Sequence, residues 1–380
     1  MAQRSVNPVS RRPSVIAPGR TIAALVIWAA ATATASSASE TNAKSPPRWT
    51  ISAEAVLLGR VGTGNQPLVA FVPGDVYWWT PSGLNTTNYP GAVALASNQL
   101  GQRLAPGPKL GVTYRGASGW SAELSYFSVV GLGATRTRGP ENPGQWLVMK
   151  APGSFWQTQD FAYQSMAWRA DSGLHSLEAN VRRDVSPRVT LFAGLRWLQL
   201  NDTLQGTLTP IDIGEPDWKT TVMPATLADA KPMAGSTPVA NPPFWTTDTG
   251  NSLYGVQIGA RATVWQHARF SVEALAKAGV YANHAEQAAL VSIRKQLNPA
   301  SAAVNTTSFV GEGGLVARFG VTDAVAFKLG YDILWLNGVA LAPTQIAQMS
   351  TTPTTVTATG VDTGASTLFQ GLSFGVEYTF

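Results

Sequence analysis

The chain has 380 residues, with 27 Lys and Arg against 22 Asp and Glu, and it contains no cysteine. The lack of cysteine excludes disulfides and thiol chemistry. No run of about 18 apolar residues follows the N-terminal region, and this excludes transmembrane helices from the rest of the chain.

Residues 1–35 have the order of a secretory signal peptide. Four arginines precede an apolar run from Ile22 to Ala33, and residues 1–35 contain no acidic residue. Small residues then allow cleavage between 31 and 38. The run is too short to span a membrane comfortably, so we interpret it as a signal peptide rather than an anchor. The polar residues 36–47 are predicted to form a periplasmic leader.

Removal of that segment changes the charge balance. Without its four arginines the chain has 23 basic and 22 acidic residues, a net charge of +1 in place of +5. The basic character therefore belongs to the signal peptide, and nucleic-acid binding loses its electrostatic basis. We expect no nucleic-acid partner.

Apolar and polar residues alternate with a period of two from Trp49 to the end of the chain, which is typical of strands with two different faces. Ten such segments occur, near 49–58, 109–115, 120–126, 177–182, 189–197, 254–262, 270–280, 309–319, 325–335 and 374–380. The sequence predicts an all-β fold, a transmembrane antiparallel up-and-down β-barrel over 48–380 with about ten strands. Twelve strands are the alternative if a hairpin candidate within 145–163 enters the membrane.

All charged residues of these segments lie in the polar phase, which we expect to face the lumen. A Lys or Arg on the lipid face near the midplane costs about 2–4 kcal/mol. The predicted lumen-facing charges are Glu54, Lys109, Arg115, Glu123, Glu178, Arg182, Arg196, Arg261, Glu273, Lys277, Glu312, Arg318, Lys328, Asp332 and Glu377. Candidate ion pairs are Arg196 with Glu178, and Arg318 and Lys328 with Asp332 or Glu377.

Connections alternate between short and long. Short turns are predicted near 116–119, 185–187, 265–267 and 320–323, and long outer loops at 59–107, 131–172, 204–249, 285–305 and 338–366. Outer-membrane barrels have short periplasmic turns and long outer loops. The pattern therefore predicts outer-membrane localisation, with outer-membrane lipid around the barrel.

The chain ends with aromatic and apolar residues on one strand face. Phe374, Val376, Tyr378 and Phe380 alternate with Gly375, Glu377 and Thr379. This ending resembles the assembly signal of Gram-negative outer-membrane barrels, which implies the barrel assembly machinery as a partner. The final strand is expected to pair with 49–58 and close the sheet.

Several strand motifs carry a narrower resemblance. The segments 178–182 (EANVR), 191–198 (LFAGLRWL) and 330–334 (GYDIL) are similar to elements of a barrel family common in planctomycetes. The resemblance covers roughly 50–380 and implies a porin-like barrel without catalytic residues or cofactors.

Three functions remain open for such a barrel. The first is a porin-like narrow channel for passive diffusion of small solutes or ions, because ten to twelve strands lie between filled and open barrels. The eight basic and seven acidic lumen residues could instead neutralise one another in a non-conducting core. The second is a surface barrel that binds surface glycans or adheres through Trp-rich outer loops, where Trp78, Trp79, Trp146, Trp156, Trp168, Trp218 and Trp245 lie.

The third function, an outer-membrane enzyme, is the least favoured. Acyl or peptide attack needs a base of near-neutral pKa, and the chain has only His175, His267 and His284. The strand pattern identifies no Ser or Asp beside His175, and His267 falls in a short turn. We expect no enzyme activity, no cofactor and no metal site.

Overall fold

The computed structural model describes residues 49–61, 64–72, 79–80, 83–84, 92–101, 104–116, 119–141, 146–149, 163–210, 244–293, 296–351 and 356–380. These residues belong to one compact unit, Pro47–Phe380. The predicted signal peptide, 1–35, and the predicted leader, 36–47, lie outside the described residues.

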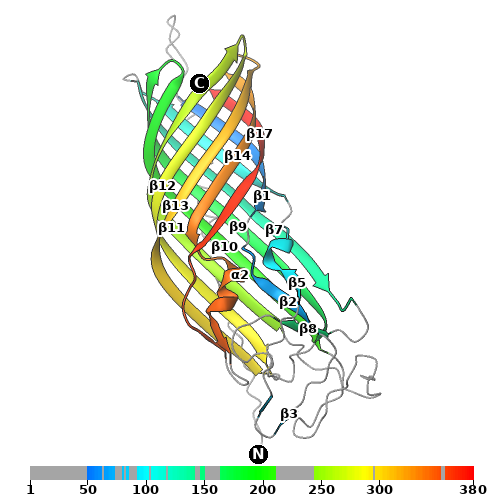
Figure 1. Cartoon of the computed structure of the whole chain (residues 1–380). Helices are drawn as coiled ribbons and strands as arrows, with labels where there is room; N and C mark the ends of the chain where they lie inside the picture. Colours follow the sequence, from blue (N-terminus) through cyan, green and yellow to red (C-terminus); the bar gives the residue numbers. More distant parts are fainter. Residues whose placement is uncertain are drawn as a thin grey trace, which may run out of the picture. The chain divides into compact units, whose positions relative to one another are not determined.

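The described residues form an antiparallel up-and-down β-barrel of the transmembrane type, with ten strands in the ring (Figure 1). The predicted fold class is therefore confirmed. The pairing of β9 with β10 closes the ring of strands. The ring strands are β1 (Trp49–Val61), β6 (Ala105–Arg115), β7 (Trp120–Arg138), β9 (Tyr163–Ser186), β10 (Val189–Pro210), β11 (Phe244–His267), β12 (Phe270–Ile293), β13 (Gln296–Gly320), β14 (Val325–Val339) and β17 (Ala365–Thr379).

The first and last ring strands close the barrel against each other. β1 and β17 pair from Thr50↔Thr379 to Val61↔Leu368. Beyond that ladder, Trp49 and Phe380 exchange two backbone hydrogen bonds of 3.0 and 2.9 Å. The predicted pairing of the C-terminal strand with 49–58 is confirmed, and Phe380 is part of the closure.

Four short turns join the strands at one end of the barrel, called the short-turn end below; the opposite end is the long-loop end. Three of the turns lie at 187–188, 268–269 and 321–324, and the connection between β6 and β7 includes 117–118, which lie outside the described residues. The third turn follows His267, a few residues later than predicted, because β11 continues through Trp265 to His267. Ala268 takes the left-handed conformation there, with φ of 50°.

The strands β7 and β9–β13 are much longer than the alternation predicted. They run into the ranges 131–172, 204–249 and 285–305, which were predicted as long outer loops, and the last of these is strand apart from 294–295, which lie outside the described residues. The difference arises because the prediction ended each strand where its outward apolar residues ended. The backbone continues as strand beyond that point with a different pattern of side chains.

The outward face of the long strands changes from apolar to polar at one row of cross-strand neighbours. On the short-turn side of this row, the next outward residues are Tyr126, Leu177, Trp197, Tyr254 and Ala282. The row itself is entirely polar and consists of Ser128, His175, Gln199, Ser252, His284 and Asn305. The side toward the short-turn end thus has the apolar exterior that suits lipid, and the side toward the long-loop end has an exterior that suits water.

Short elements between the ring strands fill the long-loop end (Figure 1). They are β2 (Pro67–Val72), β5 (Val93–Ala96), η1 (Ser97–Gln99), β8 (Trp146–Met149), α2 (Ala342–Gln345), η3 (Ile346–Gln348), β15 (Met349–Thr351) and β16 (Val356–Ala358). A further two-stranded piece is formed by β3 (Trp79–Thr80) and β4 (Gly83–Leu84). Among the described residues, no helix is long and apolar enough to cross a membrane.

The hairpin candidate within 145–163 does not add strands to the ring. Its first part is β8, which pairs with β2 and meets β9 only at Leu147↔Tyr163. Its remainder, 150–162, lies outside the described residues. The ring therefore has ten strands rather than twelve.

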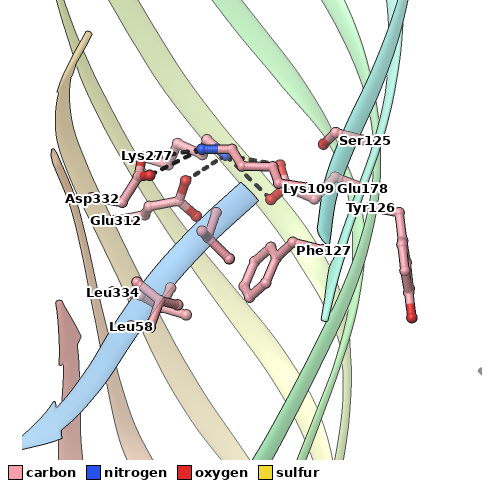
Figure 2. A pocket seen from close by; sticks show the side chains of 11 residues that line it. Leu58, Lys109, Ser125, Tyr126, Phe127, Glu178, Lys277, Glu312, Asp332 and Leu334 are labelled. Carbon is pink, nitrogen blue, oxygen red and sulfur yellow. Dashed lines mark hydrogen bonds and ion pairs between the residues drawn. The ribbon is translucent and has the colours of Figure 1, made fainter. Parts of the chain in front are cut away.

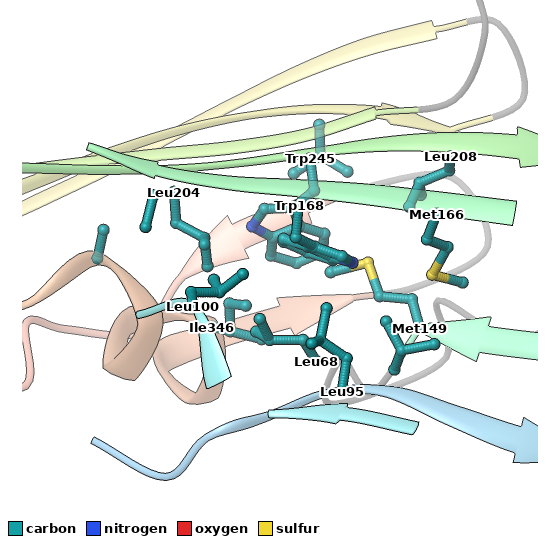
Figure 3. Close-up of a cluster of buried hydrophobic side chains, with 14 of the residues drawn as sticks. Leu68, Leu95, Leu100, Met149, Met166, Trp168, Leu204, Leu208, Trp245 and Ile346 are labelled. Atoms are coloured by element: carbon teal, nitrogen blue, oxygen red, sulfur yellow. The ribbon is translucent and has the colours of Figure 1, made fainter. Parts of the chain in front are cut away.

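A large apolar cluster, called the outer core below, holds these inserted elements against the inner face of the long strands (Figure 3). Trp168 of β9 and Trp245 of β11 lie in it with no exposed surface. Its buried members are Leu68, Val69, Ala94, Leu95, Leu100, Leu147, Met149, Met166, Trp168, Ala170, Leu204, Leu208, Trp245, Ala289, Val291, Ala342, Ile346, Met349 and Val356. The barrel interior is thus apolar where its exterior is polar.

Candidate functional site

The charged residues of the ring strands meet inside the barrel near the short-turn end. Of the fifteen predicted lumen charges, fourteen make ion pairs with one another. Within the described part of the chain, Arg115 is the one that makes none. The lumen therefore contains compensated charge rather than a ring of one sign.

Two cations and two carboxylates form the centre of this layer. Arg196 lies 3.4 Å from Glu178 and 2.8 Å from Glu312, measured between guanidinium nitrogens and carboxylate oxygens. The Lys277 ammonium lies 3.0 Å from Glu178 and 2.8 Å from Glu312. The Gln257 side-chain amide donates a further hydrogen bond of 2.8 Å to Glu178. Buried charges need such partners, because an unpaired one is strongly destabilising.

The remaining pairs connect strands that are neighbours in the ring or that lie further apart in it. Lys109 pairs with Asp332 at 3.1 Å, and Arg318 pairs with Glu377 at 3.0 Å. Lys328 contacts Glu54 rather than Asp332 or Glu377, the partners suggested by the sequence. Around Glu123, Arg182 makes a close pair, and Arg261 lies 3.9 Å away and also 3.8 Å from Glu273.

A second apolar cluster, called the inner core below, lies in the lumen beyond the charged layer. It is built by inward side chains of the ring and by the start of the β14–β17 connection. Its buried members are Val56, Leu58, Ala105, Val129, Leu132, Leu174, Leu198, Leu200, Leu253, Tyr281, Val310, Leu334, Leu336, Val339, Leu341 and Phe369. Water-filled pores have polar interiors, and this layer of the lumen is apolar instead.

A buried ion pair, Arg60 with Asp202, lies between the two apolar clusters. The two groups are 2.7 Å apart, with side-chain exposures of 0% and 2%. Arg60 also donates to Thr367 and Ser172, and the other Asp202 oxygen accepts a 3.0 Å bond from the Ala342 backbone N–H at the start of α2. Asp202 therefore fastens the β14–β17 connection inside the barrel.

The sequence prediction missed this pair. Arg60 was assigned to the loop 59–107, and Asp202 follows the last predicted residue of its strand. One pattern could have found both: Arg60 continues the inward phase of Glu54, Val56 and Leu58, and Asp202 continues that of Leu198 and Leu200. The outer core was missed for the same reason.

A cavity lies between the charged layer and the inner core (Figure 2). Its empty volume is about 500 Å³, including space that is open to solvent. Carboxylates and amines line one side, and apolar side chains line the other. The lining residues are Val56, Leu58, Lys109, Ser125, Tyr126, Phe127, Glu178, Lys277, Glu312, Asp332 and Leu334.

Two of the seven loop tryptophans have described side chains, and both are buried. Trp168 and Trp245 belong to the outer core, and the Trp245 indole N–H donates to Thr247 at 2.9 Å. The side chains of Trp78, Trp79, Trp146, Trp156 and Trp218 lie outside the described residues. The two described rings stabilise the fold and are not available at the surface for stacking on a ligand.

The histidines lie away from the cavity. His175 Nδ1 is 2.9 Å from the hydroxyl of Ser128 on the neighbouring strand, a neighbour that the strand pattern did not identify. The sequence could not show this neighbour because Ser128 falls after the predicted end of its strand. His284 Nδ1 lies 2.8 Å from Asn305. Within the described ranges, no group of three or more His, Asp or Glu is placed to hold a metal ion.

Aromatic residues lie on the surface of the short-turn end. Trp49, Tyr114, Trp120, Phe270, Phe319 and Phe380 are all exposed. Trp49 and Tyr114 are in ring contact at 4.8 Å, and Tyr378 stacks with Phe380 at 5.6 Å. Phe374, Val376 and Tyr378 are exposed on the outer face of β17. Nearer the long-loop end, Tyr254 and Trp335 are exposed, whereas Tyr126 is buried.

Comparisons with known proteins give similar folds only. No family model and no curated protein matches the chain. The outer-membrane protease OmpT from Escherichia coli has a TM-score of 0.46 at 12% identity, covering 90% of this chain and 99% of that chain. The translocator domain of the autotransporter NalP from Neisseria meningitidis has a TM-score of 0.37 at 8% identity, covering 95% and 96%. The toluene transporter TodX from Pseudomonas putida has a TM-score of 0.35 at 7% identity, covering 88% and 90%.

Proposed function

We propose that the protein is an outer-membrane barrel that does not conduct, and that it serves as a membrane-anchored scaffold for the folded region at its long-loop end. The observation that carries this proposal is the filled interior. Two apolar clusters, with the buried Arg60–Asp202 pair between them, occupy the lumen beyond the charged layer. It corresponds to the non-conducting alternative considered from the sequence, in which the lumen charges neutralise one another, and it does not include ligand binding by Trp168 and Trp245, which are buried.

The compensated charges support the same function. Selective pores present rings of one charge sign to the ions that pass. Here the central residues Arg196, Lys277, Glu178 and Glu312 neutralise one another at distances of 2.8–3.4 Å. Their arrangement suits a rigid polar core that joins opposite walls of the barrel.

Surface presentation follows from the two faces of the long strands. Their polar exterior and apolar interior beyond the row from Ser128 to Asn305 suit a water-exposed extension of the barrel. We place this extension outside the cell, because short turns face the periplasm in outer-membrane barrels. The signal peptide at 1–35, the route through the periplasm and the partnership with the assembly machinery are parts of the same proposal, as is membership of the planctomycete barrel family.

Recordings in planar lipid bilayers test the closed lumen. We expect no stable conductance from the intact protein. Replacement of the inner-core residues Leu198, Leu200 and Leu253 by alanine removes apolar volume from one level of the lumen and should raise the conductance above zero. A matched triple replacement on the outer face, at Leu195, Val256 and Ile258, should leave it at zero. Stable conductance from the unmodified protein contradicts the proposal.

The narrow channel remains the second candidate, and one observation favours it. The cavity beside Lys109 and Asp332 is partly open to solvent, so the lumen is not filled along its whole length. A porin-like function would need the inner core to open. Small, stable single-channel currents in the same recordings would select this candidate over the closed scaffold.

A further inference from the structure

The outer surface of β7 and β9, called the β7–β9 wall below, has a polar contact at each edge of its apolar part. Toward the short-turn end, the Arg183 guanidinium lies over the ring of its cross-strand partner Trp120, 5.0 Å from the ring centroid. Toward the long-loop end, His175 Nδ1 lies 2.9 Å from the hydroxyl of its partner Ser128. Both contacts join the same two strands, and they are eight residues apart on each strand.

Arg183 is a charged residue in the outward phase of β9. It follows the inward Arg182 and is exposed, so it faces the surroundings of the barrel and not the lumen. No carboxylate within the described ranges forms an ion pair with it. Arginine on the lipid face is tolerated near an interface but not near the midplane of a bilayer. The interface at the short-turn end is therefore expected at the level of Arg183 and Trp120.

The apolar surface between the two contacts is short. Its outward residues are Ala122, Leu124 and Tyr126 on β7 and Val181, Ala179 and Leu177 on β9. Eight residues of an antiparallel strand span about 27 Å, which at a tilt of about 40° corresponds to about 20 Å along the barrel axis. The apolar band of an outer-membrane barrel is about 25 Å tall. The β7–β9 wall is therefore shorter than the hydrocarbon layer that it has to meet.

β12, four strands from β7 in the ring order, has a taller apolar surface. Its outward phase begins at Phe270 and reaches its first polar residue at His284, which lies 2.8 Å from Asn305. These ends are fourteen residues apart, and every outward residue between them is Val or Ala. The apolar exterior of the barrel is thus uneven in height, and it is low at the β7–β9 wall.

A membrane can meet a short apolar surface in three ways. Flanking polar side chains can extend along the strand to the headgroups, copies of the protein can associate, or the bilayer can thin. Extension is restricted here, because Arg183 stacks on its direct neighbour Trp120 and His175 is held by its direct neighbour Ser128. Both polar groups thus stay at the levels of their own strand positions.

We propose that the β7–β9 wall is a phospholipid-binding surface that thins the bilayer beside it. Arg183 binds the phosphate of a lipid in the leaflet at the short-turn end, and Trp120 holds the guanidinium at that level. A guanidinium without a carboxylate partner suits a phosphate, to which it can donate two parallel hydrogen bonds. The acyl chain lies against the short apolar surface, and the headgroups of the opposite leaflet reach the level of Ser128 and His175.

Two fluorophores at matched heights test this surface on the full chain in phosphatidylcholine bilayers. The chain has no cysteine, so Ala179→Cys on β9 and Ala278→Cys on β12 each provide a single attachment site. Both residues are exposed, and they lie eight and nine residues from the turns at 187–188 and 268–269. Lipids with a nitroxide on the headgroup or near the end of the acyl chain quench the fluorophore according to its depth. We expect the ratio of headgroup quenching to chain quenching to be at least twofold higher at Ala179, whereas a flat bilayer would give equal ratios.

Apolar replacement of the polar edges is the second part of the test. The triple variant Ser128→Val, His175→Leu and Arg183→Leu lengthens the apolar surface and should bring the ratio on β9 to that on β12. The matched control is His284→Leu with Asn305→Val, which removes the polar pair of the taller wall and should change neither ratio. The two walls thus respond differently to the same kind of replacement.

Two single variants test the phosphate contact. Arg183→Lys keeps the positive charge and should retain at least half of the difference between the two walls, whereas Arg183→Leu should lose it. Equal ratios for these two variants would exclude phosphate binding by Arg183.

Three further results would overturn the inference. The first is equal ratios at Ala179 and Ala278 in the protein with its polar edges intact. The second is an unchanged ratio in the triple variant, folded by its gel mobility. The third is loss of quenching by both lipids at Ala179, which would show that a second copy covers the wall. None of these results depends on conductance, so failure here is distinct from failure of the closed scaffold.

Discussion

At the scale of single residues, Gly107 has a requirement that no other residue type meets. A methyl group there would occupy the position of the Ser128 carbonyl. Forcing atoms into a packed site costs about 1–3 kcal/mol. We therefore expect Gly107→Ala to lower the free energy of unfolding by about that amount, measured by urea denaturation in detergent micelles.

Gly101→Ala is the matched control for that replacement. Gly101 has open space around the Cβ position, and its backbone is not in the left-handed region. The control should change the stability by less than about 0.5 kcal/mol, as ordinary surface replacements do. Equal effects of the two variants would show that the backbone of β7 does not contact Gly107.

The buried ion pair of Arg60 with Asp202 provides a second prediction for single residues. Removing one partner leaves an uncompensated buried charge, at a cost of about 3–5 kcal/mol. Arg60→Met and Asp202→Leu should each destabilise the fold by that order, and the double variant by less than the sum of the two. The exposed pair Arg169–Asp171, at 62% and 33% side-chain exposure, is the control and should show coupling below about 1 kcal/mol. Additive effects at Arg60 and Asp202 would contradict the role of the pair in fastening the β14–β17 connection.

At the scale of strands, the sequence predicts the half of each strand whose outer face is apolar. Val256 and Ile258 alternate with Gln257 and Gly259, and such a pattern identifies a strand without knowledge of its neighbours. The other half was not predicted because its pattern is inverted. Leu198 and Leu200 point inward there and alternate with the outward Gln199 and Asn201. The inserted elements that fill this part of the barrel come from distant parts of the chain.

The ion pairs inside the barrel could likewise be predicted only in part from the sequence. Arg196 and Glu178 are opposite each other on paired strands, so strand register alone predicts their meeting. Arg60 and Asp202 are separated by 142 residues, and Lys328 and Glu54 by 274. Whether such residues meet depends on ring order and stagger, which alternation does not fix.

The closing strand provides a prediction at this scale. Phe380 exchanges two backbone hydrogen bonds with Trp49 and stacks on Tyr378. Deletion of Phe380 removes the last pair of the β1–β17 closure, and we expect less folded protein in the outer membrane. The replacement Phe380→Tyr keeps both the backbone bonds and the ring, and it should assemble normally. Normal levels of folded protein after the deletion would exclude a role of this residue in assembly.

At the scale of the whole molecule, the barrel combines two kinds of packing along one set of strands. Near the short-turn end it has an apolar exterior and a charged interior, as membrane barrels do. Beyond the polar row it has a polar exterior and an apolar core, as water-soluble proteins do. The inner core lies between the two regions, and our proposal of a closed lumen rests on it.

A spin-label accessibility scan along β11, from Trp245 to Ala262, tests this arrangement most directly. Outward positions from 254 to 262 should be accessible to oxygen, which partitions into lipid, and outward positions 246, 248 and 252 to a polar nickel complex. The inward positions of Asn251 and Leu253, buried in the lumen, should be accessible to neither. Access of the nickel complex to these two positions would show a water-filled lumen and contradict the closed barrel.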